Sequence, residues 1–276
     1  MFVKLERYIR GRIDWYRLIN SDYAVVSFGK SGRTWLRMLL SRFYQIRFRL
    51  SAEALLDYDN LHLLNKSVPI FHFTHDNYIG DYTGNGESKT DYYRRAVILL
   101  VRDPRDTAVS QYFQWKYRMR ARKKLINAYP SEAEAPSVFD FVMSDAAGLP
   151  KILRFMNRWA SVLPRIEHHH LLYYEDLRAD QTTALRHLLN FLGEQPTDKE
   201  LADCIDFASV ENMRRLELGR AVLGSRLRPA DPQNPDSFKV RRAKVGGFRD
   251  YFSPAELDVI DSLVKKDLST LFRYGR

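Results

Sequence analysis

A short segment near the N-terminus combines residue types that suit phosphate binding. Residues 27–36 read Ser-Phe-Gly-Lys-Ser-Gly-Arg-Thr-Trp-Leu and lie between a β-type apolar run and a stretch with helical spacing. Backbone N–H groups in such a loop, together with the N-terminus of the helix behind them, form a cradle for an anion. Lys30 adds a positive point charge to that cradle. The segment therefore predicts a phosphate-binding loop.

A Walker A loop is one form that this segment could take. That loop has the pattern Gly-x-x-x-x-Gly-Lys-Ser/Thr. Gly29, Lys30 and Ser31 fit its second half, but Ala24 stands where the first glycine belongs. The pattern is therefore incomplete, and a phosphate loop of another kind is the alternative.

A second phosphate contact is predicted further along the chain. Arg102 directly follows the apolar run 96–101, and Ser110 comes eight residues later in a helical pattern. An arginine that leaves a strand and a serine in the following helix can converge on one phosphate, the arginine through a bidentate fork and the serine through its hydroxyl. Alone, the sequence Arg-Asp-Pro would indicate only a turn. Joined to the Lys30 loop, it indicates a site for a multiply charged nucleotide.

Two histidines supply candidates for a general base. Residues 71–76 read Phe-His-Phe-Thr-His-Asp and end a short apolar run. Imidazole titrates near neutral pH and is therefore suited to taking a proton from a reacting group. His72 and His75 are three residues apart, so a strand would point them to opposite faces. One of them is expected to be structural.

The elements that position these residues alternate along the chain. Apolar runs typical of buried strands lie at residues 22–28, 68–74, 96–101 and 170–174. Helical patterns lie at residues 34–44, 107–124, 137–144, 149–162, 181–192, 198–207 and 211–218, and after the expected N-cap Ser253. Residues 219–239, with three prolines, are expected to form a mobile loop. The alternation predicts an α/β fold: a single domain with a central, mainly parallel sheet flanked by helices.

The composition is that of a folded domain with an excess of positive charge. Of 276 residues, 45% are hydrophobic, which excludes a disordered chain. Lys and Arg number 44 against 34 Asp and Glu, so the net charge of +10 indicates an anionic partner. The single cysteine, Cys204, excludes an intrachain disulfide framework and a cysteine-cluster metal site, and it favours a reducing, cytoplasmic location.

Two features of the sequence concern contact with a membrane: its longest apolar run and its amphipathic N-terminal segment. The longest apolar run, residues 96–101, is much shorter than the roughly 20 residues of a spanning helix, so none is expected. Residues 1–20 predict a basic amphipathic helix, separate from a domain over residues 21–276. Packing of its apolar stripe on the domain is favoured, and peripheral membrane contact is the alternative. The apolar stripe consists of Phe2, Leu5, Ile9, Ile13, Tyr16 and Leu18.

The basic run 116–124 is expected to be a solvated helix face.

These motifs together resemble the sulfotransferases that use 3′-phosphoadenosine-5′-phosphosulfate (PAPS). Their 5′-phosphosulfate loop has the form Pro-Lys-Ser-Gly-Thr-Thr-Trp-Leu, and residues 30–36 are similar to it except at Arg33. The Arg102 and Ser110 pair is similar to the family's 3′-phosphate motif. Residues 238–252 resemble its C-terminal Arg-Lys-Gly-x-x-Gly-x-Trp segment, although Ala243 replaces a glycine and Phe248 a tryptophan. Residues 172–177 are similar to its Tyr-Glu-Asp-Leu stretch.

The resemblance implies a P-loop-like core and the transfer of a sulfuryl group from PAPS to a hydroxyl or amine, with PAP as the product. The acceptor could be a glycan, a glycolipid or a small metabolite. Lys30 would stabilise the leaving phosphate, and His75, in a Thr-His pair like the family's Lys-Thr-His, would be the base. No metal is required. The implied cofactor-binding residues are Lys30, Ser31, Gly32, Arg33, Thr34, Trp35, Arg102, Ser110, Tyr174, Ser209, Arg241 and Arg242.

Two other functions compete with this one. A P-loop kinase using Mg-ATP is an alternative because residues 97–103 loosely resemble a Walker B strand, but Ala24 and Arg102 argue against it. A non-catalytic basic protein that binds nucleic acid is the second alternative, although no nucleic-acid partner is expected. Neither the acceptor nor an oligomeric state follows from the sequence.

Overall fold

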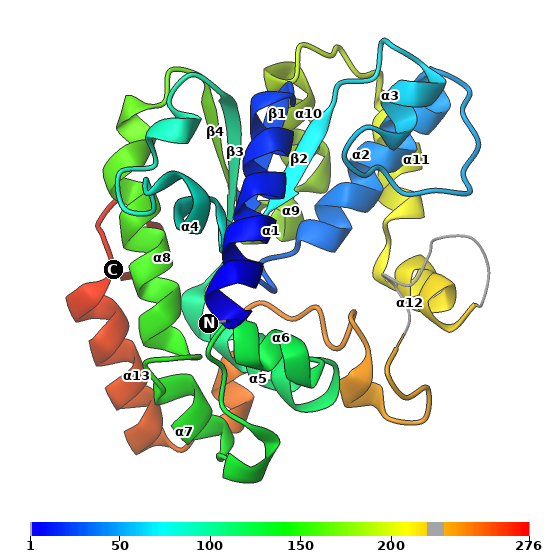
Figure 1. The fold of residues 1–276 in the computed structure, drawn as a ribbon. Helices are drawn as coiled ribbons and strands as arrows, with labels where there is room; N and C mark the ends of the chain where they lie inside the picture. Colours follow the sequence, from blue (N-terminus) through cyan, green and yellow to red (C-terminus); the bar gives the residue numbers. More distant parts are fainter. Residues whose placement is uncertain (1, 220–228, 276) are drawn as a thin grey trace.

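A parallel sheet lies at the centre of the fold in a computed structural model, which describes residues 2–219 and 229–275 (Figure 1). Its four strands are arranged in the order β2-β1-β3-β4 and all pair in parallel. All four carboxyl ends therefore lie at one edge. The predicted fold class and its four strands are confirmed. The strands are β1 Tyr23–Ser27, β2 Phe71–Thr74, β3 Ala96–Val101 and β4 His169–Tyr173.

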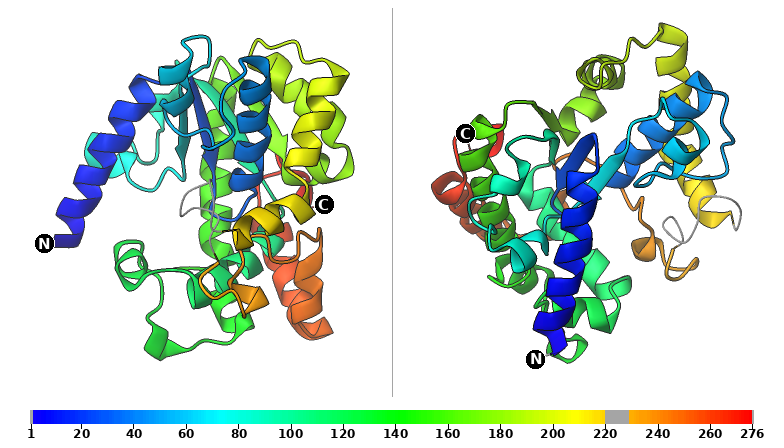
Figure 2. Two further views of the ribbon diagram at one scale, coloured as in Figure 1. Left: turned by 90° about the vertical axis from the view of Figure 1, so that its right-hand side faces the viewer. Right: turned by 45° about the horizontal axis from the view of Figure 1, so that its top comes forward.

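Helices connect the strands and cover both faces of the sheet (Figures 1 and 2). The α-helices are α1 Phe2–Ile19, α2 Arg33–Arg47, α3 Asn60–Leu64, α4 Ile79–Thr83, α5 Pro104–Tyr117, α6 Ala121–Ile126, α7 Val138–Met143, α8 Leu149–Val162, α9 Tyr174–Ala179, α10 Gln181–Phe191, α11 Asp198–Phe207, α12 Val210–Leu218 and α13 Pro254–Asp267. Short 3₁₀ helices are η1 Thr90–Tyr92, η2 Glu132–Glu134, η3 Leu163–Arg165, η5 Pro235–Ser237, η6 Gly247–Tyr251 and η7 Arg273–Gly275. Of the loop expected at 219–239, residues 220–228 lie outside the described residues.

Alternate residues of the central strands enter two separate cores. Val26 and Leu99 pack with residues of α5 and α8 on one face of the sheet. Val25 and Ile98 pack with residues of α2 and α10 on the other. Because successive side chains of a strand point to opposite faces, strands that are covered on both faces must be apolar throughout. This explains the continuous apolar run of β3.

Strand order also determines where a ligand can bind. The chain passes from β1 through α2 to β2, and then returns to the other side of β1 to form β3. In an open parallel sheet, the crevice outside the carboxyl ends at such a reversal is the preferred ligand site. Here the reversal is centred on β1, which leads directly into the loop of Lys30.

The helix expected at 107–124 is in fact two helices. α5 ends at Tyr117 and α6 begins at Ala121. The break coincides with Arg118, whose guanidinium donates to the Glu217 carboxylate (3.0 Å) and the Ser237 carbonyl (2.7 Å). Most basic side chains of the run 116–124 are exposed, as expected of a solvated face, but Lys124 is an exception, because it is buried with its ammonium 4.8 Å from the centre of the Trp115 ring.

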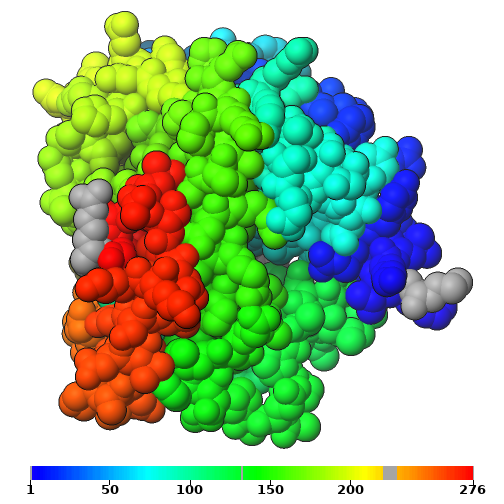
Figure 3. Space-filling model, turned by 90° about the vertical axis from the view of Figure 1, so that its left-hand side faces the viewer, coloured from blue at the N-terminus to red at the C-terminus, as the bar shows by residue number. Residues whose placement is uncertain are grey.

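Helix α1 packs through the face opposite to its apolar stripe. Gly11 touches the Tyr78 carbonyl of the α4 region so closely that a Cβ would lie 2.2 Å from its oxygen. Leu18 is buried, whereas Phe2, Ile9 and the rest of the stripe are exposed. The expectation that this stripe packs on the domain was therefore wrong, apart from Leu18. The N-terminal turns of α1 project from the body of the molecule in Figures 2 and 3. None of the helices in the described part of the chain is sufficiently long and apolar to span a bilayer.

Candidate active site

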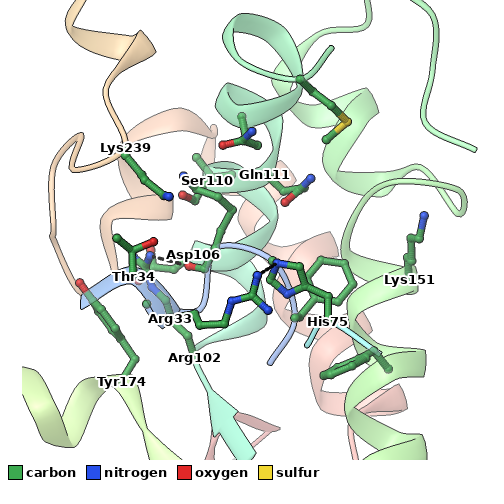
Figure 4. Close-up of a pocket in the computed structure, with 18 of the residues that line it drawn as sticks. Arg33, Thr34, His75, Arg102, Asp106, Ser110, Gln111, Lys151, Tyr174 and Lys239 are labelled. Atoms are coloured by element: carbon green, nitrogen blue, oxygen red, sulfur yellow. Dashed lines mark hydrogen bonds and ion pairs between the residues drawn. The ribbon is translucent and has the colours of Figure 1, made fainter. Parts of the chain in front are cut away.

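A cavity of about 870 Å³ opens at the carboxyl edge of the sheet. A lining residue follows each strand closely: Lys30 after β1, His75 after β2, Arg102 after β3 and Tyr174 after β4. Parallel pairing thus brings together side chains that are far apart in the sequence. Figure 4 shows Lys239, Thr34 and Tyr174 to one side of Arg33 and His75, and Lys151 to the other side.

The loop between β1 and α2 has the backbone of an anion cradle. Gly32 has φ +99°, and a Cβ there would lie 2.6 Å from the Tyr174 ring, so a glycine is required. Lys30 also has a positive φ, 75°, which is costly for a residue with a side chain. α2 starts at Arg33 without a side-chain cap, so its first N–H groups have no partner within the helix. These groups and Lys30 suit a phosphate or sulfate.

Lys30 is held among other cations. Burial, and then the charges of Arg118 and Arg102, lower the pKa of its ammonium to about 7. Among the described residues no carboxylate forms an ion pair with Lys30. A cluster of like charges in a partly desolvated site is costly unless an anion binds there. This end of the cavity therefore fits a ligand with several negative charges.

The Arg102 guanidinium has one buried N–H group without a hydrogen-bond partner among the described residues. Its guanidinium donates to the carbonyls of Lys30 (3.4 Å) and Lys244 (3.2 Å), pairs with Asp106 (3.4 Å) and lies 4.5 Å from the centre of the Tyr174 ring. Its Nε is buried and has no hydrogen-bond partner. Because buried N–H groups are almost always hydrogen-bonded, an oxygen of a ligand is the expected acceptor. Ser110 lines the same cavity from α5.

Aromatic side chains line the cavity beside the phosphate loop. Trp35 and Tyr174 meet edge to face with ring centres 5.5 Å apart, and the Arg178 guanidinium lies 5.6 Å from the Trp35 ring. Thr34 also lines the cavity here. Planar groups of this kind suit the base of a nucleotide.

The two arginines of the C-terminal segment line the cavity in different environments. The Arg241 guanidinium lies 3.8 Å from the centre of the Phe113 ring, contacts the Tyr251 hydroxyl and pairs with Asp236 at 3.4 Å. Arg242 is more exposed and pairs with Asp250 at 2.5 Å. Both cations are therefore oriented by carboxylates while they border the cavity.

His75 has one defined tautomer. Its Nδ1 lies 2.8 Å from the Ser27 carbonyl oxygen, and its Nε2 lies 2.8 Å from Nη2 of Arg33. Because the carbonyl can only accept and the guanidinium can only donate, Nδ1 carries the proton and Nε2 is the acceptor. Burial and the positive charge of Arg33 hold the pKa of His75 well below its usual value of 6.5. The ring is therefore a neutral base whose basic nitrogen is covered by Arg33.

The other histidine has no place in the cavity. His72 is buried in β2 and is not among the lining residues. Burial lowers the pKa of its imidazole to about 3. Next to His75, the Asp76 carboxylate pairs with Lys89 (2.6 Å) and accepts from the Tyr92 hydroxyl (3.1 Å). This buried pair anchors the turn that presents His75.

Comparison with known proteins decides the family. A sulfotransferase domain matches residues 93–272, which include Arg102, Ser110, Tyr174 and both arginines of the C-terminal segment. The chain belongs to the sulfotransferase family. Flavonol 3-sulfotransferase of Flaveria bidentis is 23% identical and the alignment covers 95% of this chain and 88% of the relative. Cytosolic sulfotransferase 14 of Arabidopsis thaliana is 27% identical, with 92% and 77% covered.

Solved structures share the fold of this sulfotransferase. A mouse sulfotransferase complexed with PAP has a TM-score of 0.62 at 21% identity, with 93% of this chain and 87% of that chain covered. A retinol dehydratase in complex with androsterone and PAP has a TM-score of 0.57 at 17% identity, with 91% and 82% covered. The family and the P-loop-like α/β fold expected from the sequence are thus confirmed, and the kinase and nucleic-acid alternatives are not favoured.

Two residues expected at the cofactor do not line the cavity of this sulfotransferase, although their neighbours in the sequence do. Ser209 caps α12, where its hydroxyl accepts from the Asn212 N–H (3.2 Å), and it does not line the cavity. Ser31 is buried and also does not line it. The remaining expected residues, from Lys30 and Gly32 to Arg242, border one cavity.

Sequence reasoning missed the carboxylates that hold the C-terminal segment of the sulfotransferase in place. Asp106 accepts from the N–H groups of Gly246 (2.8 Å) and Phe248 (2.9 Å). Glu217 is buried and accepts from Arg118 and from the Val240 N–H (3.2 Å). Asp106 lies four residues after Arg102, but nothing in the sequence marks Glu217. Together they anchor the segment over the cavity.

Proposed function

We propose that this sulfotransferase transfers the sulfuryl group of PAPS to a hydroxyl or amine of an acceptor. The observation that carries the proposal is the juxtaposition of two chemistries in one cavity. A cluster of cations around Lys30 and Arg102 fits the two phosphate groups of the nucleotide, with Lys30 at the leaving phosphate, and a neutral imidazole, His75, provides a base on the acceptor side. Displacement at sulfur requires these two functions.

The proposed roles follow from the position of each side chain. PAPS supplies the sulfuryl group, whose bond to the 5′-phosphate oxygen breaks as the acceptor oxygen bonds to sulfur. Lys30 and the N–H groups at the start of α2 hold the 5′ end and take up the charge on the phosphate. His75 Nε2 takes the acceptor proton.

The rest of the nucleotide is assigned to the same end of the cavity, beside Lys30, where the Arg102 guanidinium donates to the Lys30 carbonyl (3.4 Å). Arg102, through its unpartnered Nε, and Ser110 hold the 3′-phosphate in this proposal, with Arg241 and Arg242 closing over it. Trp35 and Tyr174 contact the base. The mouse sulfotransferase and the retinol dehydratase with the same fold were both solved in complex with PAP, which supports this choice of nucleotide.

Titration calorimetry tests the nucleotide. We expect PAP to bind with micromolar or tighter affinity without Mg²⁺, because several charge-assisted hydrogen bonds are available to its phosphates. Mg-ATP should bind at least about tenfold more weakly, since it has no 3′-phosphate for Arg102. Mg-ATP binding with indifference to PAP would contradict the proposal. Loss of binding in Arg102→Met, with Arg165→Met as a surface control, would locate the 3′-phosphate.

We further propose that α1 rests on an anionic membrane surface. The five exposed residues of its apolar stripe, Phe2, Leu5, Ile9, Ile13 and Tyr16, span about 80° of the helix, opposite to the face that packs on α4. Two exposed arginines, Arg12 and Arg17, flank the stripe on its two sides, so its charge complements acidic lipid headgroups. The cytoplasmic face of a membrane fits this arrangement, and the cytosolic sulfotransferases among the relatives support a cytoplasmic location.

Vesicle co-sedimentation tests the membrane contact. The protein should sediment with vesicles that contain phosphatidylserine and much less with pure phosphatidylcholine. Ile9→Glu should abolish sedimentation, whereas Val259→Glu on α13, with the same 49% exposure, should not change it. No sedimentation of the wild type would overturn the proposal. If Ile9→Glu instead dissociates a dimer in size-exclusion chromatography, the stripe is an interface between two copies.

A further inference from the structure

The acceptor end of the cavity is unusually rich in cations. Beyond His75, the walls contributed by α1, α6 and α8 place Arg7, Lys123, Lys151, Arg154 and Arg158 around the opening. Asp76 is the carboxylate among the described lining residues on this side, and it is already paired with Lys89. The neutral hydroxyl of an acceptor needs none of this charge.

Some of these cations have carboxylate partners on the surface and therefore carry little information. Arg7 pairs with Asp81 (2.8 Å), Arg154 with Asp145 and Arg158 with Glu87. Such pairs are structural in most proteins.

Two lysines differ from these arginines. Lys123 makes no side-chain hydrogen bond or ion pair with any residue in the described ranges. Within the described ranges, the Lys151 ammonium donates to the carbonyls of Asn127 (2.9 Å) and Ala146 (2.8 Å) and lies 4.3 Å from the centre of the Tyr129 ring, and no carboxylate there forms an ion pair with it. Burial and neighbouring arginines lower the pKa of both ammonium groups, for Lys151 to about 8. An anion at this end would relieve that repulsion.

Arg33 adds a second, independent observation. Its Nη2 donates to Nε2 of His75, the same nitrogen that must receive the acceptor proton (Figure 4). The guanidinium must therefore move before the base can act. A guanidinium that bonds to an anion gains the attraction between opposite charges in addition to the hydrogen bond, which a neutral imidazole does not offer, so a negatively charged group nearby can draw Arg33 away from the imidazole.

We propose that the acceptor carries an anionic group, a carboxylate or a sulfate or phosphate ester, that binds between Lys123 and Arg33 and thereby uncovers His75. The inference rests on the proposed sulfuryl transfer and specifies its substrate class. The nucleotide does not account for the lysines at this end, because Arg102 and Lys151 lie on opposite sides of His75 in Figure 4 and Arg102 is assigned to a phosphate of the nucleotide. Neutral acceptors leave the base covered.

Matched acceptor pairs test the inference; the two members of a pair have the same hydroxyl groups and differ only in a carboxylate or its amide. The pairs are 4-hydroxyphenylacetate and 4-hydroxyphenylacetamide, glucuronate and glucuronamide, and 6-hydroxyhexanoate and its amide. With PAPS, the carboxylate of at least one pair should have a kcat/KM roughly 10- to 100-fold higher than its amide, the range for one charge-assisted hydrogen bond. Equal rates, or faster reaction of the amides, would overturn the inference.

Variants distinguish the role of Lys123 from that of Arg33. Lys123→Met should raise KM for the carboxylate about tenfold and change kcat little, because it removes binding that ground and transition states share. Arg33→Thr, the residue type of the family loop, should increase turnover of the amides and reduce the preference for carboxylates. Lys265→Met, which removes a charge from the exposed surface of α13, is the control and should behave as the wild type.

The pH dependence of the rate tests whether Arg33 acts on the His75 imidazole. Arg33 lowers the pKa of this imidazole, so Arg33→Thr should move the acidic limb of the rate profile to higher pH. A merely structural role of Arg33 would leave that limb in place.

If the enzyme turns over neither member of any pair, the affinities for these acceptors test the inference instead. The PAP-loaded protein is then titrated with both members of each pair, and a preference for the carboxylate of about tenfold or more supports the inference. Equal affinity, or no binding of either, overturns it. Failure of the proposed function is distinguishable, because it would appear earlier as an inability to bind PAP in the absence of any acceptor.

Discussion

Replacing His75 with asparagine should lower kcat by about 10²- to 10⁴-fold, the usual contribution of a general base. Asparagine retains a polar side chain of similar length but cannot take a proton at the working pH. PAP affinity should be unchanged, because the phosphates bind at the Lys30 end of the cavity. The measurement is steady-state turnover with PAPS and the best acceptor, together with calorimetry of PAP binding.

The pH profile gives the same prediction a second readout. His75 acts as a base in its neutral form, and burial together with the Arg33 charge keeps its pKa well below 6.5. Lys123 and Lys239 also face the ring and lower its pKa, and Asp14 of α1 lies near Arg33. The rate should therefore be maintained as the pH falls through 6.5 and decline only below it.

A matched histidine provides the control for this variant. His187 is exposed on α10 and does not line the cavity, so His187→Asn should retain full activity. Retention of most of the turnover in His75→Asn would show that another group, or the acceptor itself, disposes of the proton. Loss of PAP binding in the same variant would indicate a folding defect instead, which a thermal melt would detect.

The parts of the site that follow strands could be predicted from the sequence. Apolar runs locate buried strands because parallel sheets are covered on both faces, and each run is followed by a polar residue with obvious chemistry. Lys30 and Arg102 were found in this way. Ser253 was also predicted as an N-cap, and its capping box with Glu256 is present, because capping depends on residues only three positions apart.

Features that depend on distant contacts could not be predicted. The burial of Lys124 follows from its position on the Trp115 ring, and the break at Arg118 coincides with contacts to Glu217 and Ser237, none of which has a local sequence signal. Helix α1 shows the same limit, since its apolar stripe predicted the wrong packing face. The face that docks on α4 combines the close approach at Gly11 with the contact between the Trp15 and Tyr82 rings, whose centres are 5.6 Å apart.

Arg33 stands where the family loop has a threonine, and this one substitution changes which groups the loop contacts. The sequence assigns it to the cofactor because its neighbours bind phosphate. The structure places its guanidinium on the base, where a threonine of the family loop would be too short to reach. A departure from a motif therefore deserves testing on both sides of the loop that carries it.

Lys30→Met should reduce kcat about 10²- to 10³-fold, the loss typical of removing one preorganised donor from a developing charge. Methionine matches the length of the side chain and removes its charge. Lys30→Arg should recover part of the rate, since a cation is restored at slightly different geometry. Lys199→Met, on the exposed surface of α11, is the control and should be active. A kcat for Lys30→Met within about threefold of the wild type would exclude Lys30 from stabilising the leaving group.

The lowered pKa of Lys30 predicts that the protein takes up a proton when PAP binds. Without a ligand its pKa is about 7, so at about pH 8 most of the ammonium is deprotonated. Bound phosphate favours the charged form and raises the pKa, so PAP binding should take up a proton at that pH and weaken as the pH rises further. Calorimetry in buffers of different ionisation enthalpy measures the uptake. Lys30→Met should lower it by up to one proton, while Lys239, whose pKa is also lowered by burial, supplies the remainder. Unchanged uptake would mean that Lys30 is charged before the nucleotide arrives.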